Sequence, residues 1–147
     1  MKNAALRALA EDYGERIQRF CPLEMVEIKD GRATDSARRL REEGMALREI
    51  LSKKKGKGNP MAVIWDERGK PLNTQALATF LDQEISRGHG VDLILGSSHG
   101  LEAALKEEIP RHFQLSSFTL THEWARALTL EQIYRAFCLL RGFPYHH

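Results

Sequence analysis

Residues 91–101, with the sequence VDLILGSSHGL, decide the fold class of this chain. A mostly apolar run, 91–95, meets a short loop bounded by Gly96 and Gly100, and a helical pattern begins at Leu101. A buried strand that leads through a glycine-bearing turn into a helix is the repeating unit of parallel sheets. We therefore predict an α/β domain with a mainly parallel sheet.

The same alternation of strands and helices extends outward to both ends of the chain. Apolar residues recur at steps of three and four in five stretches, which predicts helices over 3–20, 33–51, 73–88, 101–109 and 121–140. Short apolar or alternating runs predict strands over 23–30, 61–66, 91–96 and 113–120. The remaining connections are predicted to be a basic loop and a turn, at 52–60 and 67–73.

Side chains that cap helices stand at the predicted start of two of them. Thr34 or Asp35 precedes the second helix, and Asn73 or Thr74 begins the third. A chain of 147 residues with one such alternating pattern is predicted to be a single domain, 1–147.

Composition and charge exclude several functional classes. With 42% hydrophobic and 29% charged residues, the chain has the composition of an ordinary soluble domain. Its longest apolar runs are too short to span a membrane, and the N-terminal stretch lacks the hydrophobic core of a signal peptide. Cys21, Cys138 and the six histidines show no metal-ligand spacing. We therefore expect a cytoplasmic protein that binds neither a membrane nor a metal. The net charge of +2 does not by itself indicate nucleic acid.

Candidate ligand-binding loops follow the strands at one edge of the predicted sheet. Parallel sheets bind ligands at the carboxyl ends of their strands, which here are the loops after Trp65, Leu95 and Phe118. Gly96 and Gly100 would let the backbone approach a ligand closely, but their loop matches neither G-x-G-x-x-G nor a Walker sequence. A structural turn also explains these glycines, so both interpretations remain open.

Three further patterns have a functional and a structural interpretation. Residues 115–126, LSSFTLTHEWAR, place hydroxyl groups and His122 at a strand-to-helix junction, where they either bind a ligand or cap a helix. Residues 53–57, KKKGK, either grip phosphates or form a solvated loop. Glu131 and Arg135, four residues apart, either belong to a site or form a surface ion pair.

The chain ends in aromatic and imidazole side chains, GFPYHH at 142–147. Chain ends usually fray, and a frayed end is normally polar. This end is therefore either the remnant of an expression tag or part of a folded site.

Three segments in order, VDLILGSSHGL, LSSFTLTHEWARALTLEQIYRAF and GFPYHH, resemble one family closely. It is that of the small bacterial SPOUT methyltransferases, which methylate N3 of a pseudouridine in 23S ribosomal RNA. The family pattern has a loop I-G-G-x-x-G, a segment L-S-x-x-T-x-x-H-x-x-x-R-x-x-x-x-E-Q-x-Y-R-A, and an end P-Y-H with a basic residue. WDERGKPLNT also fits the family's loop after the middle strand. The residues that match the last two patterns are Leu115, Ser116, Thr119, His122, Arg126, Glu131, Gln132, Tyr134, Arg135, Ala136, Pro144, Tyr145 and His146.

Three positions depart from the family pattern. Met1 and Lys2 lead straight into the first helix where the family has a strand and a Gly-Lys loop. We therefore expect a sheet that lacks the family's first strand, with either lower stability or an open sheet edge as the consequence. Ser97 stands where the family has its second loop glycine, and His147 stands where it has a basic residue.

The resemblance implies a parallel α/β knot, with the C-terminal part of the sheet threaded as a trefoil knot, a rare exception to unknotted topology. It also implies S-adenosylmethionine as cofactor and a homodimer in which the partner completes the site. An aromatic-bearing last helix, with Trp124, Tyr134 and Phe137, agrees with a dimer. By position, the cofactor loops are Trp65–Gly69, Gly96–Gly100 and Leu115–Leu120. The cofactor-binding residues expected from these loops are Trp65, Gly96, Gly100, Leu115, Ser116, Ser117, Phe118, Thr119 and Leu120.

The catalytic residues implied by the resemblance are Tyr145, His146, Arg126 and Glu131. Methyl transfer to a ring nitrogen needs in-line positioning and loss of the N3 proton, which a neutral imidazole can assist. Tyr145 and His146 are therefore expected to contact the base, and Arg126 or Arg135 to steady an anion. The expected partner is 23S rRNA in the ribosome. Two alternatives remain: a catalytically impaired knotted protein that binds RNA or cofactor, and an unrelated doubly wound domain that binds a nucleotide.

Overall fold

Three parallel strands form the sheet in the computed structural model, which describes residues 2–145. The strands are β1 (Met61–Pro71), β2 (Val91–Ile94) and β3 (His112–Gln114), and their order is β2-β1-β3. β1 is parallel to both neighbours, in a register that pairs Ile64 with Ile94 and Ile64 with His112. The predicted α/β class with a parallel sheet is confirmed.

Five helices are formed by residues 2–145: α1 (Ala4–Ile17), α2 (Ser36–Lys55), α3 (Thr74–Ser86), α4 (Ala103–Glu108) and α5 (His122–Arg141). Polar side chains begin the longer ones by accepting hydrogen bonds from the first free N–H groups. Asp35 caps α2 and Asn73 caps α3, each a member of a predicted pair. Gly142 ends α5 with a φ of 72°, a left-handed conformation that glycine adopts readily. None of these helices is both long and apolar enough to cross a membrane.

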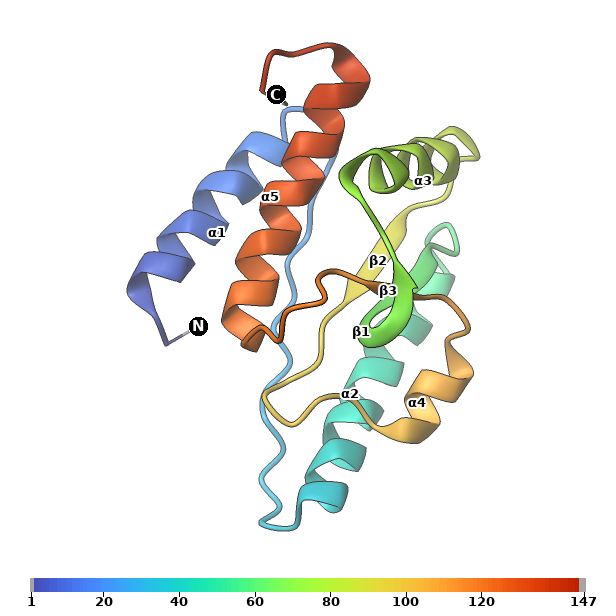
Figure 1. Ribbon diagram of the computed structural model, residues 1–147. Helices are drawn as coiled ribbons and strands as arrows, with labels where there is room; N and C mark the ends of the chain where they lie inside the picture. Colours follow the sequence, from blue (N-terminus) through green and yellow to red (C-terminus); the bar gives the residue numbers. More distant parts are fainter. Residues whose placement is uncertain (1, 146–147) are drawn as a thin grey trace.

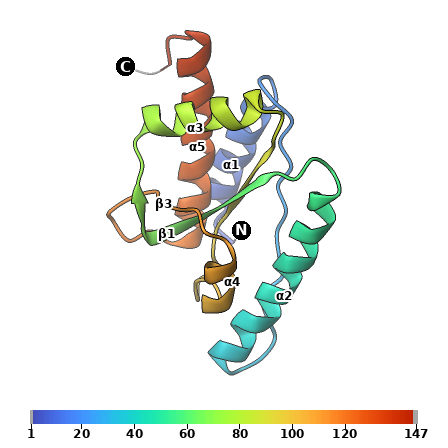
Figure 2. The same ribbon diagram turned by 90° about the vertical axis from the view of Figure 1, so that its right-hand side faces the viewer.

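The helices cover both faces of the sheet and form two cores. α1, α3 and α5 pack on one face, while α2 and α4 lie on the other (Figures 1 and 2). Consecutive strand residues point to opposite faces, and β1 shows this directly. Val63 belongs to the core under α1, α3 and α5, and Ile64 belongs to the core under α2 and α4.

β1 is longer than predicted because its pairing with β3 is interrupted and resumes. Trp65 and Lys70 both pair with Phe113, so residues 66–69 are looped out of the ladder. A Cβ atom at Gly69 would lie 2.6 Å from the carbonyl carbon of Phe113, so only glycine fits this close approach. The stretch 67–73, predicted to be a turn, is therefore partly strand, with the loop folded against β3.

Three other predictions of local structure are wrong. Residues 23–30 are extended but join no sheet among residues 2–145, because no strand lies beside them to complete a ladder. The predicted basic loop at 52–60 begins later, since α2 continues to Lys55. The strand predicted over 113–120 is confined to β3, because the hydroxyl-rich part after Gln114 turns on itself.

The sheet has an open edge beside β2, one of the two consequences expected above. β2 pairs with β1 on one side, and no strand of the described residues pairs with its other side. Segment 21–30 runs alongside, and a cavity of about 1020 Å³ separates the two.

Candidate functional site

The C-terminal tail is anchored to α1 and α5 by Tyr145. Its hydroxyl lies 2.9 Å from the hydroxyl of Tyr13 and donates to Glu131 Oε1 at 3.2 Å. The rings of Tyr145 and Tyr134 pack edge to face, with their centroids 4.7 Å apart. The guanidinium of Arg135 lies 4.6 Å from the Tyr145 ring centroid, a cation–π distance. We call these five residues the tail cluster.

Glu131 is the centre of the tail cluster. Arg135 donates to its Oε1 from Nε at 2.9 Å and from Nη2 at 2.5 Å, and this hydrogen bond raises the pKa of Arg135. Gln132 Nε2 donates to the other carboxylate oxygen at 2.7 Å, and Gln132 Oε1 accepts from Thr74 Oγ1 at 2.6 Å. The Glu131–Arg135 pair is therefore not a simple surface ion pair. Through Gln132 it connects the tail with α3.

Burial and the hydrogen bond with Tyr13 raise the pKa of Tyr145 well above its ordinary value. The phenol consequently stays protonated at neutral pH and acts as a hydrogen-bond donor, while a general base must come from another group. His146, the candidate base, lies outside the described residues, as does His147.

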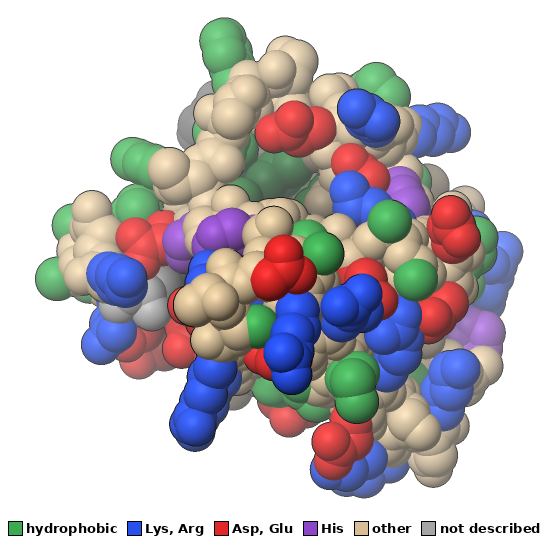
Figure 3. Space-filling view, turned by 90° about the horizontal axis from the view of Figure 1, so that it is seen from below, with side chains coloured by type: hydrophobic (Ala, Val, Ile, Leu, Met, Phe, Trp, Pro, Cys, Tyr) green, Lys and Arg blue, Asp and Glu red, His purple; other side chains and the backbone are tan. Residues whose placement is uncertain are grey.

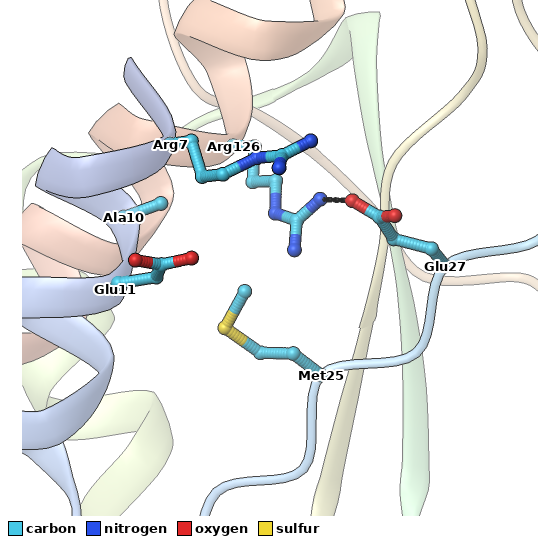
Figure 4. A pocket seen from close by; sticks show the side chains of 6 residues that line it. All are labelled: Arg7, Ala10, Glu11, Met25, Glu27 and Arg126. Carbon is cyan, nitrogen blue, oxygen red and sulfur yellow. Dashed lines mark hydrogen bonds and ion pairs between the residues drawn. The ribbon is translucent and has the colours of Figure 1, made fainter. Parts of the chain in front are cut away.

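Arg126 lies apart from the tail cluster, although it stands on the same helix. It pairs with Glu27 of segment 21–30 and lowers the pKa of that carboxyl group. Together with Arg7, Glu11 and Met25 these residues line a small pocket of about 400 Å³ (Figure 4). The structure thus brings two of the predicted catalytic residues, Tyr145 and Glu131, into contact and leaves Arg126 in another pocket.

The glycine loop 96–100 is closed by its own backbone. Ser97 N–H donates to the carbonyl of Gly100 at 3.2 Å, and Gly100 N–H donates back at 2.9 Å. Gly100 has a φ of 85°, and a Cβ at Gly96 would lie 2.9 Å from Gly100. Turn geometry therefore explains both glycines. Ser97, at the position where the family has glycine, donates to Glu43 of α2 at 3.0 Å.

The other two candidate cofactor loops are joined to each other. Gln114 Nε2 donates to the carbonyl of Glu67 at 2.9 Å, which ties the loop 66–69 to the start of the loop 115–120. Ser116 accepts from the N–H of Phe118 at 2.9 Å, and the Phe118 side chain is 81% exposed. Leu115, Ser117, Thr119 and Leu120 lie in the same loop, partly or fully exposed.

Trp65 has the one buried side-chain polar atom without a hydrogen-bond partner among the described residues, its indole Nε1. Trp65 precedes the loop 66–69, and its ring packs 6.4 Å from that of Phe113. Buried polar groups are normally satisfied. An unused donor at the edge of two candidate loops is therefore a feature that a bound ligand would explain.

Helix α5 separates the tail from the candidate cofactor loops within one chain. The loop 115–120 precedes the first residue of α5, and the tail follows its last (Figure 1). A helix of 20 residues is about 30 Å long. Although Tyr145 folds back to Glu131, the described residues of one chain do not bring Tyr145 and these loops into a single site.

Basic residues are spread over the surface and mixed with acidic ones. The face seen from below carries both kinds of charge with no large patch of one sign (Figure 3). Lys53 pairs with Glu49 at 2.8 Å, and Lys54 donates to Asp92 at 3.2 Å, so the KKKGK stretch begins as the structured end of α2. The described residues contain no group of three or more side chains suited to hold a metal ion.

Two residues of the site carried no signal that singled them out. Tyr13 counts in the sequence only as one apolar position on the first helix, and its partner is 132 residues away. Thr74 stands at a predicted helix start, and that position gives no indication of its hydrogen bond to Gln132. At the other junction, Thr121 caps α5 by accepting from the N–H of Trp124 at 3.3 Å, and His122 is exposed. The capping interpretation of that junction therefore holds for Thr121.

Comparisons with known proteins give the class and then the family. A family model described as Predicted SPOUT methyltransferase matches residues 1–146, so the class is that of the SPOUT methyltransferases. A protein of Gloeobacter violaceus, named ribosomal RNA large subunit methyltransferase H, is 39% identical over 96% of this chain and 88% of its own length. Proteins of the same name from a Geobacter species and from Caldicellulosiruptor saccharolyticus are 35% and 30% identical, over 97% and 99% of this chain and 90% and 94% of theirs. The chain belongs to the methyltransferase H family of the SPOUT class. The predicted family and enzyme class are confirmed, and the trefoil knot stays a prediction.

Proposed function

We propose that this chain methylates N3 of a pseudouridine in 23S rRNA of the ribosome, with S-adenosylmethionine as methyl donor. The relatives named above are large subunit rRNA methyltransferases, which supports the substrate class. Within the molecule, one observation carries the proposal. A partly exposed tyrosine at the end of the chain, Tyr145, is fixed by Tyr13 and Glu131, so the tail is built to present a side chain in a set direction. Action on ribosomes implies a cytoplasmic location.

The loops at the carboxyl edge of the sheet suit the proposed cofactor. Gly96 has no side chain and Ser116 has a small one, and the unused indole N–H of Trp65 can donate to an acceptor atom of the cofactor. S-adenosylmethionine supplies an electrophilic methyl group when it is bound. The chain's own residues orient the cofactor, exclude water and hold the RNA base.

We infer a homodimer because, within one chain, the loop 115–120 precedes α5 whereas Tyr145 lies beside Glu131, about two and a half turns further along that helix. Two antiparallel copies of α5 would bring the tail of one chain to the loops of the other. Each end of α5 carries exposed aromatic residues, Phe118 and Trp124 at one end and Phe143 at the other, which are 81%, 55% and 55% exposed. Two-fold symmetric contacts of this kind are the commonest closed assemblies. Phe137 is buried within the chain and is not free to contribute.

The chemistry at the base is divided among the tail residues. N3 of the pseudouridine must lose its proton before or as it accepts the methyl group, and the proposed acceptor is the imidazole of His146. Tyr145 donates a hydrogen bond or packs against the base. Arg135 is held over the Tyr145 ring by Glu131, so it contributes a fixed positive charge near the anion that forms.

A methylation assay tests the proposal. Ribosomes that lack this modification would be incubated with the chain and S-adenosylmethionine carrying a labelled methyl group, and the 23S rRNA would be digested and analysed by mass spectrometry. The label should appear as one methylated pseudouridine per ribosome. Label in another nucleotide or in protein would refute the proposed substrate.

A second candidate function is a protein that binds RNA or cofactor without turnover. The open edge of β2 favours it, because the cavity beside β2 is also lined by Gly96 and Gly100 of a cofactor loop. Calorimetry that detects cofactor binding, combined with no methylation of any ribosomal particle, would select this function.

A further inference from the structure

The loop 66–69 is held by side chains from one face of β3. His112 and Gln114 are two residues apart on this strand, so they project from the same face. His112 lies against Asp66, and Gln114 donates to the carbonyl of Glu67 at 2.9 Å. Two successive residues of the loop are therefore fixed by two side chains of the neighbouring strand.

The imidazole of His112 uses both of its ring nitrogens. Nε2 lies 2.9 Å from the carbonyl oxygen of Lys106 and 2.6 Å from that of Ile109, at the carboxyl end of α4. Carbonyl oxygens only accept hydrogen bonds, so Nε2 carries a proton and donates to them. Nδ1 lies 3.4 Å from Oδ2 of Asp66. A carboxylate also only accepts, so a proton on Nδ1 makes this contact attractive. His112 therefore connects the end of α4 with Asp66.

Asp66 is a mostly buried carboxylate that shapes the loop. Its Oδ1 accepts a hydrogen bond from the N–H of Arg68 at 3.1 Å, which forms a local turn. Its Oδ2 faces His112 and also lies 3.5 Å from Nζ of Lys106. Burial alone would raise the pKa of Asp66, but the Arg68 N–H, Lys106 and His112 together lower it. A buried carboxylate is costly without such partners, so His112 and Lys106 hold Asp66 in place.

The unused donor of Trp65 lies on the other face of the sheet from His112. Consecutive strand residues point to opposite faces, so Asp66 faces α4 while Trp65 packs against the core under α1, α3 and α5. The indole Nε1 of Trp65 belongs to the residue before Asp66, so a shift of Asp66 would displace it. Both ring nitrogens of His112 contact protein atoms. His112 therefore reaches a bound ligand only through the loop.

We propose that His112 is a positioning residue for S-adenosylmethionine, which acts through Asp66 on the loop 66–69. The inference rests on the function proposed above and adds to it a residue that sets the shape of one cofactor loop. His112 lies outside the segments that match the family pattern, so the resemblance assigns it no role.

Two substitutions separate the two contacts of His112. Asparagine places its amide nitrogen near the position of Nδ1, and glutamine places its own near that of Nε2. His112→Asn therefore keeps a donor towards Asp66, whereas His112→Gln keeps a donor towards the end of α4. Calorimetry with S-adenosylmethionine should give a Kd raised about fivefold or more for His112→Gln and within about twofold of the unmodified chain for His112→Asn. His112→Asn should instead lower Tm by roughly 2–4 °C, because two carbonyl groups lose their donor.

Steady-state kinetics separate positioning from a loss of folded protein. In His112→Gln the KM for S-adenosylmethionine should rise while the KM for ribosomes stays the same, because the tail cluster is untouched. Partial unfolding would instead lower kcat and leave both KM values unchanged. His89→Gln is the matched control. His89 Nδ1 lies 3.5 Å from Oε2 of Glu84, a comparable pair that precedes β2 at the amino edge of the sheet. This variant should bind the cofactor as the unmodified chain does.

The outcomes that overturn the inference differ from those that refute the proposed function. Equal Kd values for His112→Gln and a binding-competent unmodified chain would overturn the inference alone. Equal weakening by both substitutions would assign the effect to the end of α4 and would also overturn it. No cofactor binding by the unmodified chain would refute the proposed function, and the inference with it.

A variant of the other partner of Asp66 keeps the inference testable if neither His112 variant folds. Lys106→Gln removes the second positive group beside the carboxylate from a side chain that is 37% exposed. It should weaken cofactor binding by about twofold or more. An unchanged Kd in this variant would overturn the inference.

Discussion

The hydroxyl of Tyr145 lies 2.9 Å from that of Tyr13, so the last described residue of the chain is bound to its first helix. Tyr145 also donates to Glu131 at 3.2 Å. These contacts fix the tail on the side of α5 that faces α1. They turn a chain end, which would ordinarily fray, into a structured element.

Replacing Tyr13 with phenylalanine should loosen the tail and leave the fold intact. The change removes one partly buried hydrogen bond, so the free energy of unfolding should fall by about 1 kcal/mol or less. Methyl transfer should fall several-fold with unchanged cofactor affinity, because Tyr145 loses one of its two side-chain hydrogen bonds. Tyr134→Phe is the matched control, because the phenylalanine ring still packs against the ring of Tyr145. Equal turnover in both variants would mean that Tyr13 serves stability alone.

The raised pKa of Tyr145 predicts a loss of stability at high pH. Above an ordinary tyrosine pKa near 10, the unfolded chain releases the proton and the folded chain keeps it. The folded state therefore binds more protons, and the free energy of unfolding must decline as pH rises. Urea titrations from pH 8 to pH 11 should show a shallower decline for Tyr145→Phe than for the unmodified protein. Parallel declines would remove Tyr145 as the source.

Two substitutions at Gly100 separate turn geometry from ligand contact. Gly100 has a φ of 85° with open space at its Cβ position, so Gly100→Val strains the backbone and Gly100→Asn is tolerated better. Valine should therefore lower Tm more than asparagine. If the cofactor passes over this loop, both variants should bind it at least tenfold more weakly by calorimetry. Unchanged affinity in the asparagine variant would remove the loop from the site.

The lysines at the end of α2 should differ in their roles. Lys54 is paired with Asp92, so its removal should lower Tm by leaving that carboxylate without its partner. Lys53 and Lys55 are exposed. The double variant Lys53→Ala, Lys55→Ala should bind ribosomes more weakly, and the slope of log K against log salt concentration should become shallower by up to about two. Titration of binding against salt measures this. An unaltered slope would show that these lysines do not contact RNA.

Local sequence signals predicted the parts of the fold that depend on neighbours in the chain. The alternation around VDLILGSSHGL predicted the parallel sheet, and Asp35 and Asn73 cap helices where expected. Segment 23–30 has a strand pattern but no sheet, because pairing depends on a second strand that its own residues do not encode. The length of β1 depends on Phe113, which pairs with both Trp65 and Lys70 across a loop.

Less of the site could be predicted from the sequence, because its contacts also depend on residues that are distant in the chain. Tyr145 and Glu131 were predicted from a family resemblance, and the structure brings these two residues, 14 positions apart in the chain, into contact. The contact with Tyr13 spans 132 positions and follows only from how α1 packs on α5. The separation of the tail from the loop 115–120 follows from the length of α5, a property that becomes clear only in three dimensions.

Complementation between two inactive variants tests the central claim, a site shared between two chains, most directly. One variant lacks Tyr145, His146 and His147, and the other carries Gly96→Val, which cannot close its loop because a Cβ there meets Gly100 at 2.9 Å. Each should be inactive alone in the methylation assay. Co-refolded in equal amounts, they form mixed dimers with one intact site, and about a quarter of the normal activity should return. No recovery, with mixed dimers demonstrated by mass spectrometry, would contradict a site built from the loops of one chain and the tail of the other.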